Sequence, residues 1–213
     1  MARHAFLFDL DGVLVDTAVF HFQAWRRLTR ELGFDIDEEF NETLKGISRM
    51  DSLDRILNHG GVTLTPEEKT AYATRKNDWY LELVNQMTPA DVLPGVEDFL
   101  KAAKSRNIKI ALGSASKNAP VILEKTGILP YFDAVIDGNH VSRSKPDPEV
   151  FLKGAQALGV SNAECVVFED AYAGIQAAKA ADMYAVGIGM AEVLNNADVV
   201  VPGFEGVTPE QFV

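Results

Sequence analysis

Hydrophobic and polar residues follow two different patterns along this chain of 213 residues. From about residue 92 onward, short apolar runs alternate with amphipathic segments, which is typical of a parallel sheet with helices on both of its faces. One further apolar run stands near the N-terminus, far from the others in the sequence. These runs predict six strands, at residues 5–8, 108–112, 134–136, 165–168, 184–188 and 199–201.

Amphipathic helices are expected between the later strands. Apolar side chains recur at helical spacing over 96–103, and again over 121–126 ahead of a glycine. A third helix has well-marked ends, because Asp147 can cap its N-terminus, Pro148 suits its first turn and Gly159 can close it. The second half of the chain therefore has the strand and helix order of an α/β sheet.

The segment between the first two strands is different, because its pattern is helical nearly throughout. A stripe of mostly apolar side chains runs from Phe22 to Leu32, and Thr65 to Glu68 form the start signal of a long helix. We therefore predict an α/β fold, a Rossmann-like parallel sheet core with an inserted all-helical cap domain. The core would comprise residues 1–16 and 91–213, and the cap residues 17–90.

The composition is that of an ordinary globular protein. Hydrophobic residues make up 47% of the chain and charged residues 24%, which is enough apolar material for a sizeable core. No stretch approaches the roughly 20 apolar residues that cross a bilayer, and no export signal is evident, so we expect a cytoplasmic protein without membrane partners. The single cysteine, Cys165, lies in an apolar run, which predicts a buried and unreactive thiol.

The charge balance limits the kinds of partner. With 20 Lys and Arg against 31 Asp and Glu, the formal net charge is −11. A general nucleic-acid or membrane-surface binder needs a strong basic patch, and the sequence has no basic tail or arm that could form one. An anionic ligand would therefore require cations focused locally in a cleft.

Two acidic residues, one position apart, end the first apolar run. Asp9 and Asp11 emerge on the same side of a strand, and Gly12 lets the backbone turn where the strand stops. Two like charges held so close favour a hard divalent cation between them, and Mg2+ takes one or two carboxylates together with phosphate oxygens. The alternative is a strand that is followed by an ordinary Asp-Gly turn.

Polar residues also follow the second, third and fourth expected strands. They are Ser114 to Asn118, then Lys145, then Glu169-Asp170. Because ligands bind beyond the carboxyl ends of parallel strands, we expect these side chains to gather around Asp9 and Asp11. Taken singly, each has a plainer explanation as a loop hydroxyl, a solvated charge or an ordinary helix start.

These motifs, in this order, resemble the haloacid dehalogenase superfamily of phosphotransferases. The matching residues are Asp9-Leu10-Asp11-Gly12-Val13, Ser114, Lys145 and Glu169-Asp170. The resemblance implies that Asp9 is a nucleophile that becomes an aspartyl phosphate, and that Asp11 is the general acid and base. It also implies Mg2+ as cofactor, held by the Asp9 and Asp170 side chains and the Asp11 backbone carbonyl. Glu169 would lie in or near this set, and Ser114 and Lys145 would hold the transferring phosphoryl oxygens.

The helical insertion carries cationic groups of its own, within Lys45 to Ser52 and within Arg75 to Asn77. Lys45 and Arg49 could be a solvated pair on one helix face. With the segments around His21 and Ser114, however, these stretches resemble the hexose-phosphate mutases of the superfamily, in which a cap closes over the site. The resemblance implies that a second, non-transferring phosphate is bound by Arg49, Ser116, Lys117 and Asn118, with Ala115 in the same run. It implies that Thr17 lies at the hinge of the cap. It also implies a sugar pocket, which would be lined by His21, Trp25, Gly46, Ile47, Ser52 and Lys76.

The implied activity is that of a mutase. It would interconvert β-glucose 1-phosphate and glucose 6-phosphate through the aspartyl phosphate and β-glucose 1,6-bisphosphate, acting as a monomer on small sugar phosphates. A bisphosphate that is held in either orientation needs two anion sites. Three alternatives remain: a hexose-phosphate phosphatase of the same superfamily with water as acceptor, a 2-haloacid dehalogenase that needs no metal, and a binding module without turnover.

Overall fold

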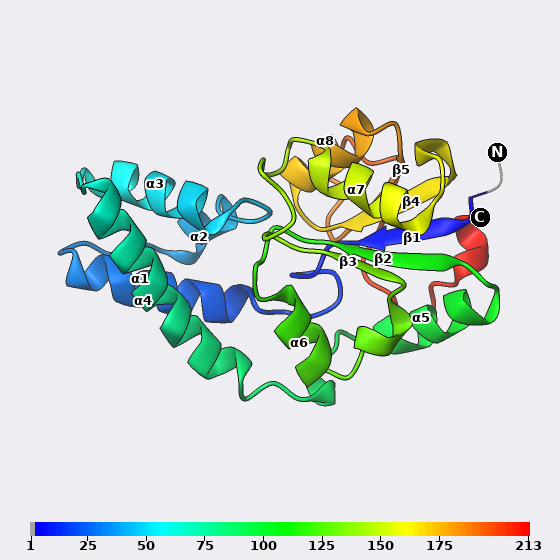
Figure 1. Cartoon of the computed structure of the whole chain (residues 1–213), viewed down its shortest axis with the longest axis horizontal. Helices are drawn as coiled ribbons and strands as arrows, with labels where there is room; N and C mark the ends of the chain where they lie inside the picture. Colours follow the sequence, from blue (N-terminus) through cyan, green and yellow to red (C-terminus); the bar gives the residue numbers. More distant parts are fainter. Residues whose placement is uncertain (1–2) are drawn as a thin grey trace.

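The apolar runs form a parallel sheet of six strands in the order β3-β2-β1-β4-β5-β6 (Figure 1). The computed structural model describes residues 3–213. All six expected strands are confirmed, and their ends shift by at most one residue. Because β1 is central, the acids that follow it lie in the middle of the carboxyl edge of the sheet. The strands are β1 (Ala5–Phe8), β2 (Lys109–Gly113), β3 (Ala134–Ile136), β4 (Cys165–Glu169), β5 (Tyr184–Ile188) and β6 (Val199–Val201).

Helices cover both faces of the sheet. They are α5 (Val96–Ser105), α6 (Ala119–Lys125), α7 (Glu149–Leu158) and α8 (Tyr172–Ala180). Phe6 and Phe8 of β1 join a buried cluster with side chains of α5 and α6, and the rings of Phe6 and Phe99 stack with their centroids 5.7 Å apart. Leu7 points the opposite way and belongs to a second cluster with Phe151 of α7. Burial on both faces explains why the strands are continuous apolar runs in the sequence.

The helix ends follow the expected capping residues with small differences. Helix α7 begins at Glu149, so Pro148 occupies the capping position instead of the first turn. Asp147 still stabilises this start, because its Oδ1 accepts a hydrogen bond from the Glu149 backbone N–H at 3.0 Å. Gly159 ends the helix in the left-handed conformation, as expected.

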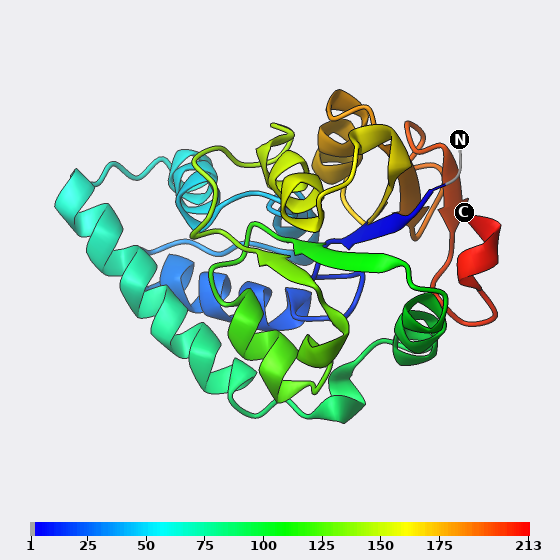
Figure 2. The same cartoon turned by 45° about the vertical axis from the view of Figure 1, so that its right-hand side comes forward.

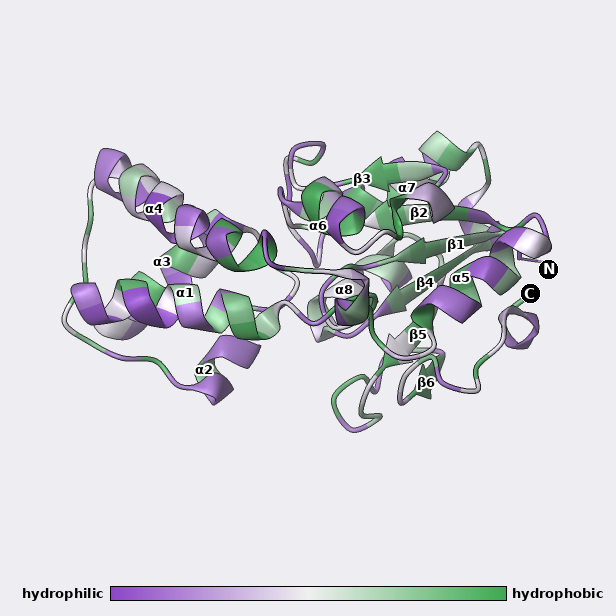
Figure 3. Ribbon diagram, turned by 90° about the horizontal axis from the view of Figure 1, so that it is seen from below, coloured by the Kyte–Doolittle hydropathy of each residue, from purple (hydrophilic) through white to green (hydrophobic). Residues whose placement is uncertain are grey.

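Four further helices stand apart from the sheet, and we call them the helical unit (Figure 3). They are α1 (Ala18–Glu31), α2 (Glu38–Glu42), α3 (Arg49–Gly60) and α4 (Pro66–Val84). Leu28 and Leu53 belong to a buried apolar cluster that is separate from the two clusters of the sheet. Helix α4 begins with the expected capping box, in which Thr65 and Glu68 each accept a hydrogen bond from the other's backbone N–H.

The chain enters and leaves the helical unit at one place, beside the carboxyl end of β1. Val15 on the way out forms an antiparallel bridge with Val92 on the way back, and the Leu93 N–H donates to the Leu14 carbonyl at 2.9 Å. All four helices of the unit fall inside the predicted insertion, residues 17–90. The boundaries of that insertion stay a prediction.

The helical unit lies beyond the carboxyl edge of the sheet, and the C-terminal residues lie at the opposite end of the molecule (Figure 2). Among residues 3–213, no helix is long and apolar enough to cross a membrane. Cys165 is buried as expected, and burial raises the pKa of its thiol to about 12. Single turns of 3-10 helix complete the described fold, at Pro89–Asp91, Leu129–Tyr131, Asn162–Glu164 and Pro209–Gln211.

Candidate active site

A cavity of about 870 Å³ separates the carboxyl edge of the sheet from the helical unit. Loops after the first four strands line one wall, and residues of α1, α3, α4 and the segment before α3 line the other. Of the predicted site residues, Thr17 and Glu169 are buried behind the wall. The others line the cavity: Asp9, Asp11, His21, Trp25, Gly46, Ile47, Arg49, Ser52, Lys76, Ser114, Ala115, Ser116, Lys117, Asn118, Lys145 and Asp170.

Three carboxyl groups converge at the ends of β1 and β4. Asp9, Glu169 and Asp170 each offer an oxygen atom, and these atoms lie within 4.8 Å of one another. Gly12 allows this approach, because a Cβ atom at its position would collide with the Asp170 carboxylate. Clustered carboxylate oxygens are the donors that hard divalent cations take in proteins, so the set fits a metal ion.

Two acids of this cluster, and Asp11 beside it, hold their protons more tightly than usual. Burial, followed by repulsion from Asp9, raises the pKa of Asp11 to about 7 and that of Asp170 to about 7. Burial also raises the pKa of Glu169 to about 8, although Lys145 opposes the shift. These groups therefore exchange protons near neutral pH, where a general acid and base works best.

Lys145 connects two of the acids from the loop between β3 and α7. Its buried Nζ lies 2.6 Å from Asp9 Oδ1 and 2.8 Å from Glu169 Oε2. Burial alone would lower the pKa of this ammonium, but the Asp9 and Glu169 carboxylates outweigh burial and raise it. A positive charge therefore stays beside the predicted nucleophile.

Asp11 points toward the entrance to the helical unit instead of into the cluster. Thr17 donates a hydrogen bond to Asp11 Oδ1, and the Tyr80 hydroxyl donates to Thr17 Oγ1 at 3.1 Å. Tyr80 lies on α4 and is fully buried, and burial raises the pKa of its hydroxyl well above the usual value. This chain of hydroxyls fixes the orientation of Asp11. The sequence interpretation did not single out Tyr80.

The opposite wall holds buried cations of the helical unit. Lys76 Nζ lies 2.8 Å from His21 Nδ1 and 4.3 Å from the centroid of the Trp25 ring. Burial, followed by the charge of Arg49, lowers the pKa of Lys76 well below its usual value, and burial lowers that of Arg49 as well. The side chain of His21 thus pairs with Lys76 on the helical side of the cavity. A buried ammonium with a neutral imidazole and aromatic rings around it is well placed to receive an anion.

The two walls also contact each other through polar side chains. Lys45 Nζ lies 3.5 Å from Asp170 Oδ2, so Lys45 faces the acids instead of forming a solvated pair with Arg49. Asn118 Nδ2 donates to Asn77 Oδ1 at 2.9 Å. The sequence interpretation named neither Lys45 nor Asn77 as a site residue, because local spacing carried no signal for a partner on the other wall.

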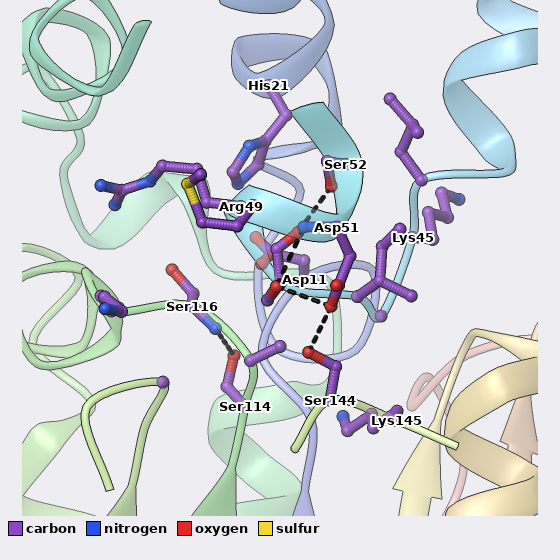
Figure 4. A pocket seen from close by; sticks show the side chains of 18 of the residues that line it. Asp11, His21, Lys45, Arg49, Asp51, Ser52, Ser114, Ser116, Ser144 and Lys145 are labelled. Carbon is purple, nitrogen blue, oxygen red and sulfur yellow. Dashed lines mark hydrogen bonds between the residues drawn. The ribbon is translucent and has the colours of Figure 1, made fainter. Parts of the chain in front are cut away.

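The loop after β2 is folded around its own hydroxyls. Ser114 Oγ accepts a hydrogen bond from the Ser116 N–H at 3.1 Å, and Ser116 Oγ accepts one from the Asn118 N–H at 3.3 Å. Figure 4 shows Ser114 and Ser116 on the sheet side of the cavity, with Arg49 and His21 on the helical side. These amides are thus used within the loop, and the two hydroxyl groups face the cavity on its sheet side.

The sequence matches the model of the haloacid dehalogenase-like hydrolases over residues 4–182, a span that includes all four motifs. The chain belongs to this family. It is 45% identical to the β-phosphoglucomutase of Bacillus subtilis over 208 residues, which are 97% of this chain and 92% of the relative. The crystal structure of β-phosphoglucomutase from Clostridium difficile matches it with a TM-score of 0.96 and 47% identity, over 98% of this chain and 95% of the other.

A phosphatase is also among the relatives. The fructose-1-phosphate phosphatase of Escherichia coli is 35% identical over 182 residues, which are 85% of this chain and 94% of that protein. The chain is thus similar both to mutases and, less strongly, to a sugar-phosphate phosphatase.

Proposed function

We propose that this protein is a β-phosphoglucomutase, which interconverts β-glucose 1-phosphate and glucose 6-phosphate. The likeness to two mutases over nearly the whole chain supports this function. The observation that carries the proposal is the pair of charged walls on one cavity. Acids and Lys145 stand on the sheet side, and Arg49 and Lys76 stand on the helical side. A substrate with two phosphates needs both walls, whereas hydrolysis of one phosphate needs the first alone.

Asp9 is the phosphoryl carrier in this proposal. In the phosphorylated enzyme, O6 of β-glucose 1-phosphate attacks the phosphorus, the bond to Asp9 breaks, and β-glucose 1,6-bisphosphate forms. The bisphosphate turns over, and Asp9 attacks the phosphorus on O1. The bond from phosphorus to O1 then breaks, which leaves glucose 6-phosphate and restores the phosphorylated Asp9. Ser114 and Lys145 hold the transferring oxygens throughout.

Asp11 moves the proton. It takes the proton of the attacking sugar hydroxyl in the first transfer and returns a proton to the departing oxygen in the second. A carboxyl group with a pKa of about 7 can do both at neutral pH. Thr17 holds the carboxyl group in place for these steps, and Tyr80 holds Thr17.

We propose Mg2+ as the metal. The Asp9 and Asp170 carboxylates and the Asp11 backbone carbonyl would hold it, with Glu169 beside them. When bound, Mg2+ would stabilise the negative charge that develops on the phosphoryl oxygens.

The helical unit acts as a cap in this proposal. Arg49, Ser116, Lys117 and Asn118 would bind the phosphate that is not being transferred, and the sugar would lie among His21, Trp25, Gly46, Ile47, Ser52 and Lys76. Binding energy from this second phosphate would favour the closed cap, which keeps water away from the aspartyl phosphate. Thr17 would lie at the hinge.

A hexose-phosphate phosphatase is the second candidate, and the phosphatase relative is the observation that favours it. The core chemistry would be the same, with water attacking the aspartyl phosphate. A dehalogenase is less well supported, because it would make no use of the acid cluster of Asp9, Glu169 and Asp170. The predicted monomeric state and cytoplasmic location stay predictions.

One experiment separates these functions. The protein is incubated with β-glucose 1-phosphate, Mg2+ and a trace of β-glucose 1,6-bisphosphate, and glucose 6-phosphate and inorganic phosphate are followed side by side. A mutase forms glucose 6-phosphate with almost no free phosphate. Stoichiometric release of phosphate would show a phosphatase instead, and no turnover at all would leave a binding module.

A further inference from the structure

Besides the contact of Asp11 with Thr17 at the entrance to the helical unit, polar side chains connect the two walls of the cavity at three points in the described part of the chain. The contact of Lys45 with Asp170 includes a proposed metal ligand, and that of Asn77 with Asn118 includes a proposed phosphate ligand. At the third point, Ser144 Oγ donates a hydrogen bond to Asp51 Oδ2 at 2.7 Å (Figure 4). Neither residue of this third contact has a role in the proposed reaction. The contact therefore joins the two walls without taking part in phosphoryl transfer.

The Asp51 carboxylate is already held in place from within its own helix. Asp51 is the third residue of α3, and Ser48 caps that helix. Ser48 Oγ donates to the same Asp51 oxygen at 2.7 Å and accepts from the Asp51 N–H at 3.2 Å. A carboxylate at this position is also stabilised by the helix N-terminus. Little conformational entropy is therefore lost when Ser144 binds to it.

The contact lies next to both proposed phosphate sites along the chain. Ser144 directly precedes Lys145, whose Nζ is 2.6 Å from Asp9 Oδ1. Asp51 lies two residues after Arg49, in the same turn of α3. The hydrogen bond therefore ties the loop that carries Lys145 to the helix start that carries Arg49. If it opens, the two cations that would hold the two ends of a bisphosphate can move apart.

The size of the effect follows from the charge on Asp51. A hydroxyl that donates to a carboxylate forms a charge-assisted hydrogen bond. Asp51 is exposed to solvent, which weakens such a bond, so its loss changes an equilibrium by about tenfold at most. If the equilibrium is that of cap closure, this change raises the fraction of enzyme molecules whose cap is open. The rate at which water reaches the aspartyl phosphate rises in proportion to that fraction.

We propose that Asp51 and Ser144 determine the acceptor specificity of this enzyme, an inference that rests on the proposed mutase function. With the contact made, a sugar hydroxyl attacks the aspartyl phosphate. With the contact broken, water attacks the phosphorus and the bond to Asp9 breaks. Inorganic phosphate leaves, the Asp9 carboxylate is restored, and Asp11 takes the proton of the water. Asp51 and Ser144 are positioning residues, since they act through the cap.

The test is the ratio of phosphate released to glucose 6-phosphate formed, measured for Ser144→Ala and Asp51→Asn with β-glucose 1-phosphate, Mg2+ and a trace of bisphosphate. We expect this ratio to rise severalfold, and by about tenfold at most, for Ser144→Ala. A loss of folded protein would lower both products equally, so it would not move the ratio. Ser144→Thr, which keeps the hydroxyl, should stay near the wild-type ratio.

Two control variants lie on α5, away from the cavity. Asp98 is the third residue of its helix, as Asp51 is, so Asp98→Asn removes the same charge at the same helical position. Ser105 donates its hydroxyl within its own helix, to the Ala102 carbonyl at 2.7 Å, so Ser105→Ala removes a hydroxyl that bridges nothing. Both controls should keep the wild-type ratio.

The outcomes are distinct for the two proposals. If the wild-type protein releases phosphate stoichiometrically, the mutase function fails, and this inference fails with it. If the wild-type protein isomerises its substrate and Ser144→Ala leaves the ratio unchanged, the inference alone is wrong. A double variant, Asp51→Asn with Ser144→Ala, should show no larger ratio than the greater single change, because both remove one interaction. Fully multiplied effects would show that the two residues act separately.

Discussion

The two walls of the cavity carry opposite charges, and burial shifts the pKa values of their side chains in opposite directions. On the sheet side it raises the pKa of Asp170 to about 7 and that of Glu169 to about 8. On the helical side it lowers the pKa of Lys76 and of Arg49. In each case burial disfavours the charged form. A bound counter-ion would stabilise the charged form on each wall: a metal ion at the acids and a phosphate at the cations.

The walls also differ in what supports them. The acids stand at the ends of central strands, with Phe6, Phe8 and Phe168 packed beneath them in a shared core. The cations stand on helices that have an apolar cluster of their own, although Tyr80 and Val84 of α4 also pack into the core shared with the sheet. We call the first wall the rigid wall and, following the proposed cap closure, the second the movable wall. The proposal predicts that chemistry at the rigid wall and closure at the movable wall are separable, and this separation can be tested.

The largest expected effect is at the rigid wall. Replacing Asp9 with Ala should reduce isomerisation by at least about 10,000-fold, because the variant has no oxygen to carry the phosphoryl group. Mass spectrometry of the intact protein, after incubation with β-glucose 1,6-bisphosphate, should show no phosphorylated form. Asp98→Asn, on the outer surface of α5, is the control and should retain full activity. Substantial turnover by the Asp9 variant would contradict the proposed carrier.

At the movable wall, Arg49→Ala should lower kcat/KM for isomerisation by about 100-fold, since it removes a charged contact to the second phosphate. Lys76→Met should lower it by a similar factor, since it removes the buried charge beside the sugar. Phosphorylation of Asp9 by a small donor such as acetyl phosphate should change little, because that donor has no second phosphate. Arg30→Ala is the control, since Arg30 lies on the outside of the helical unit and pairs with Asp35. Equal loss with both donors would show that the two walls are not separable.

The two walls should also respond to pH with opposite sign. Mg2+ needs the deprotonated forms of Asp170 and Glu169, so its binding releases protons and its affinity rises with pH. If one proton is released, the affinity should rise about tenfold per pH unit between about pH 6 and 8. Phosphate favours the protonated form of Lys76, so its binding takes up a proton and tightens as pH falls. Calorimetry in two buffers of different ionisation enthalpy measures both proton counts. If Mg2+ and phosphate both released protons on binding, or both took them up, the opposite behaviour of the two walls would be contradicted.

The smallest effect concerns stability. Thr65→Ala removes one half of the capping box of α4, which should cost about 1 kcal/mol, or roughly a fivefold loss of protection for amides of that helix. Hydrogen exchange should show this loss in α4 and no change in β1 or β4. Ser105→Ala serves as a control at the end of a sheet-side helix. Equal loss of protection in the strands would show that the sheet and the helical unit unfold together.

Much of the fold could be predicted from the sequence, because each local signal agreed with the final structure. The strands are buried on both faces, so they are plain apolar runs, and all six expected strands are present. Helix ends were less certain, as the start of α7 shows. Asp147 and Pro148 both favour a helix start, and the backbone settles one residue later than expected.

Which residues surround the cavity could also be predicted, since residues that follow parallel strands gather at one edge. What the sequence could not predict is how those residues pair. Lys45 and Arg49 are four residues apart, which indicates a shared helix face, yet Lys45 lies before α3 and reaches Asp170. Tyr80 and Asp51 have ordinary helical positions, and their partners Thr17 and Ser144 come from distant parts of the chain. Such contacts depend on how one body packs on another, for which local spacing carries no signal.

The bridge between Val15 and Val92 brings both chain connections of the helical unit to one place. Because both connections lie there, the unit can be exchanged as one insertion. Exchanging residues 17–90 for the corresponding segment of a relative would break no strand pairing and would leave the catalytic acids in place. New sugar preferences could therefore arise by changing the lid alone, while the phosphoryl-transfer machinery is inherited intact.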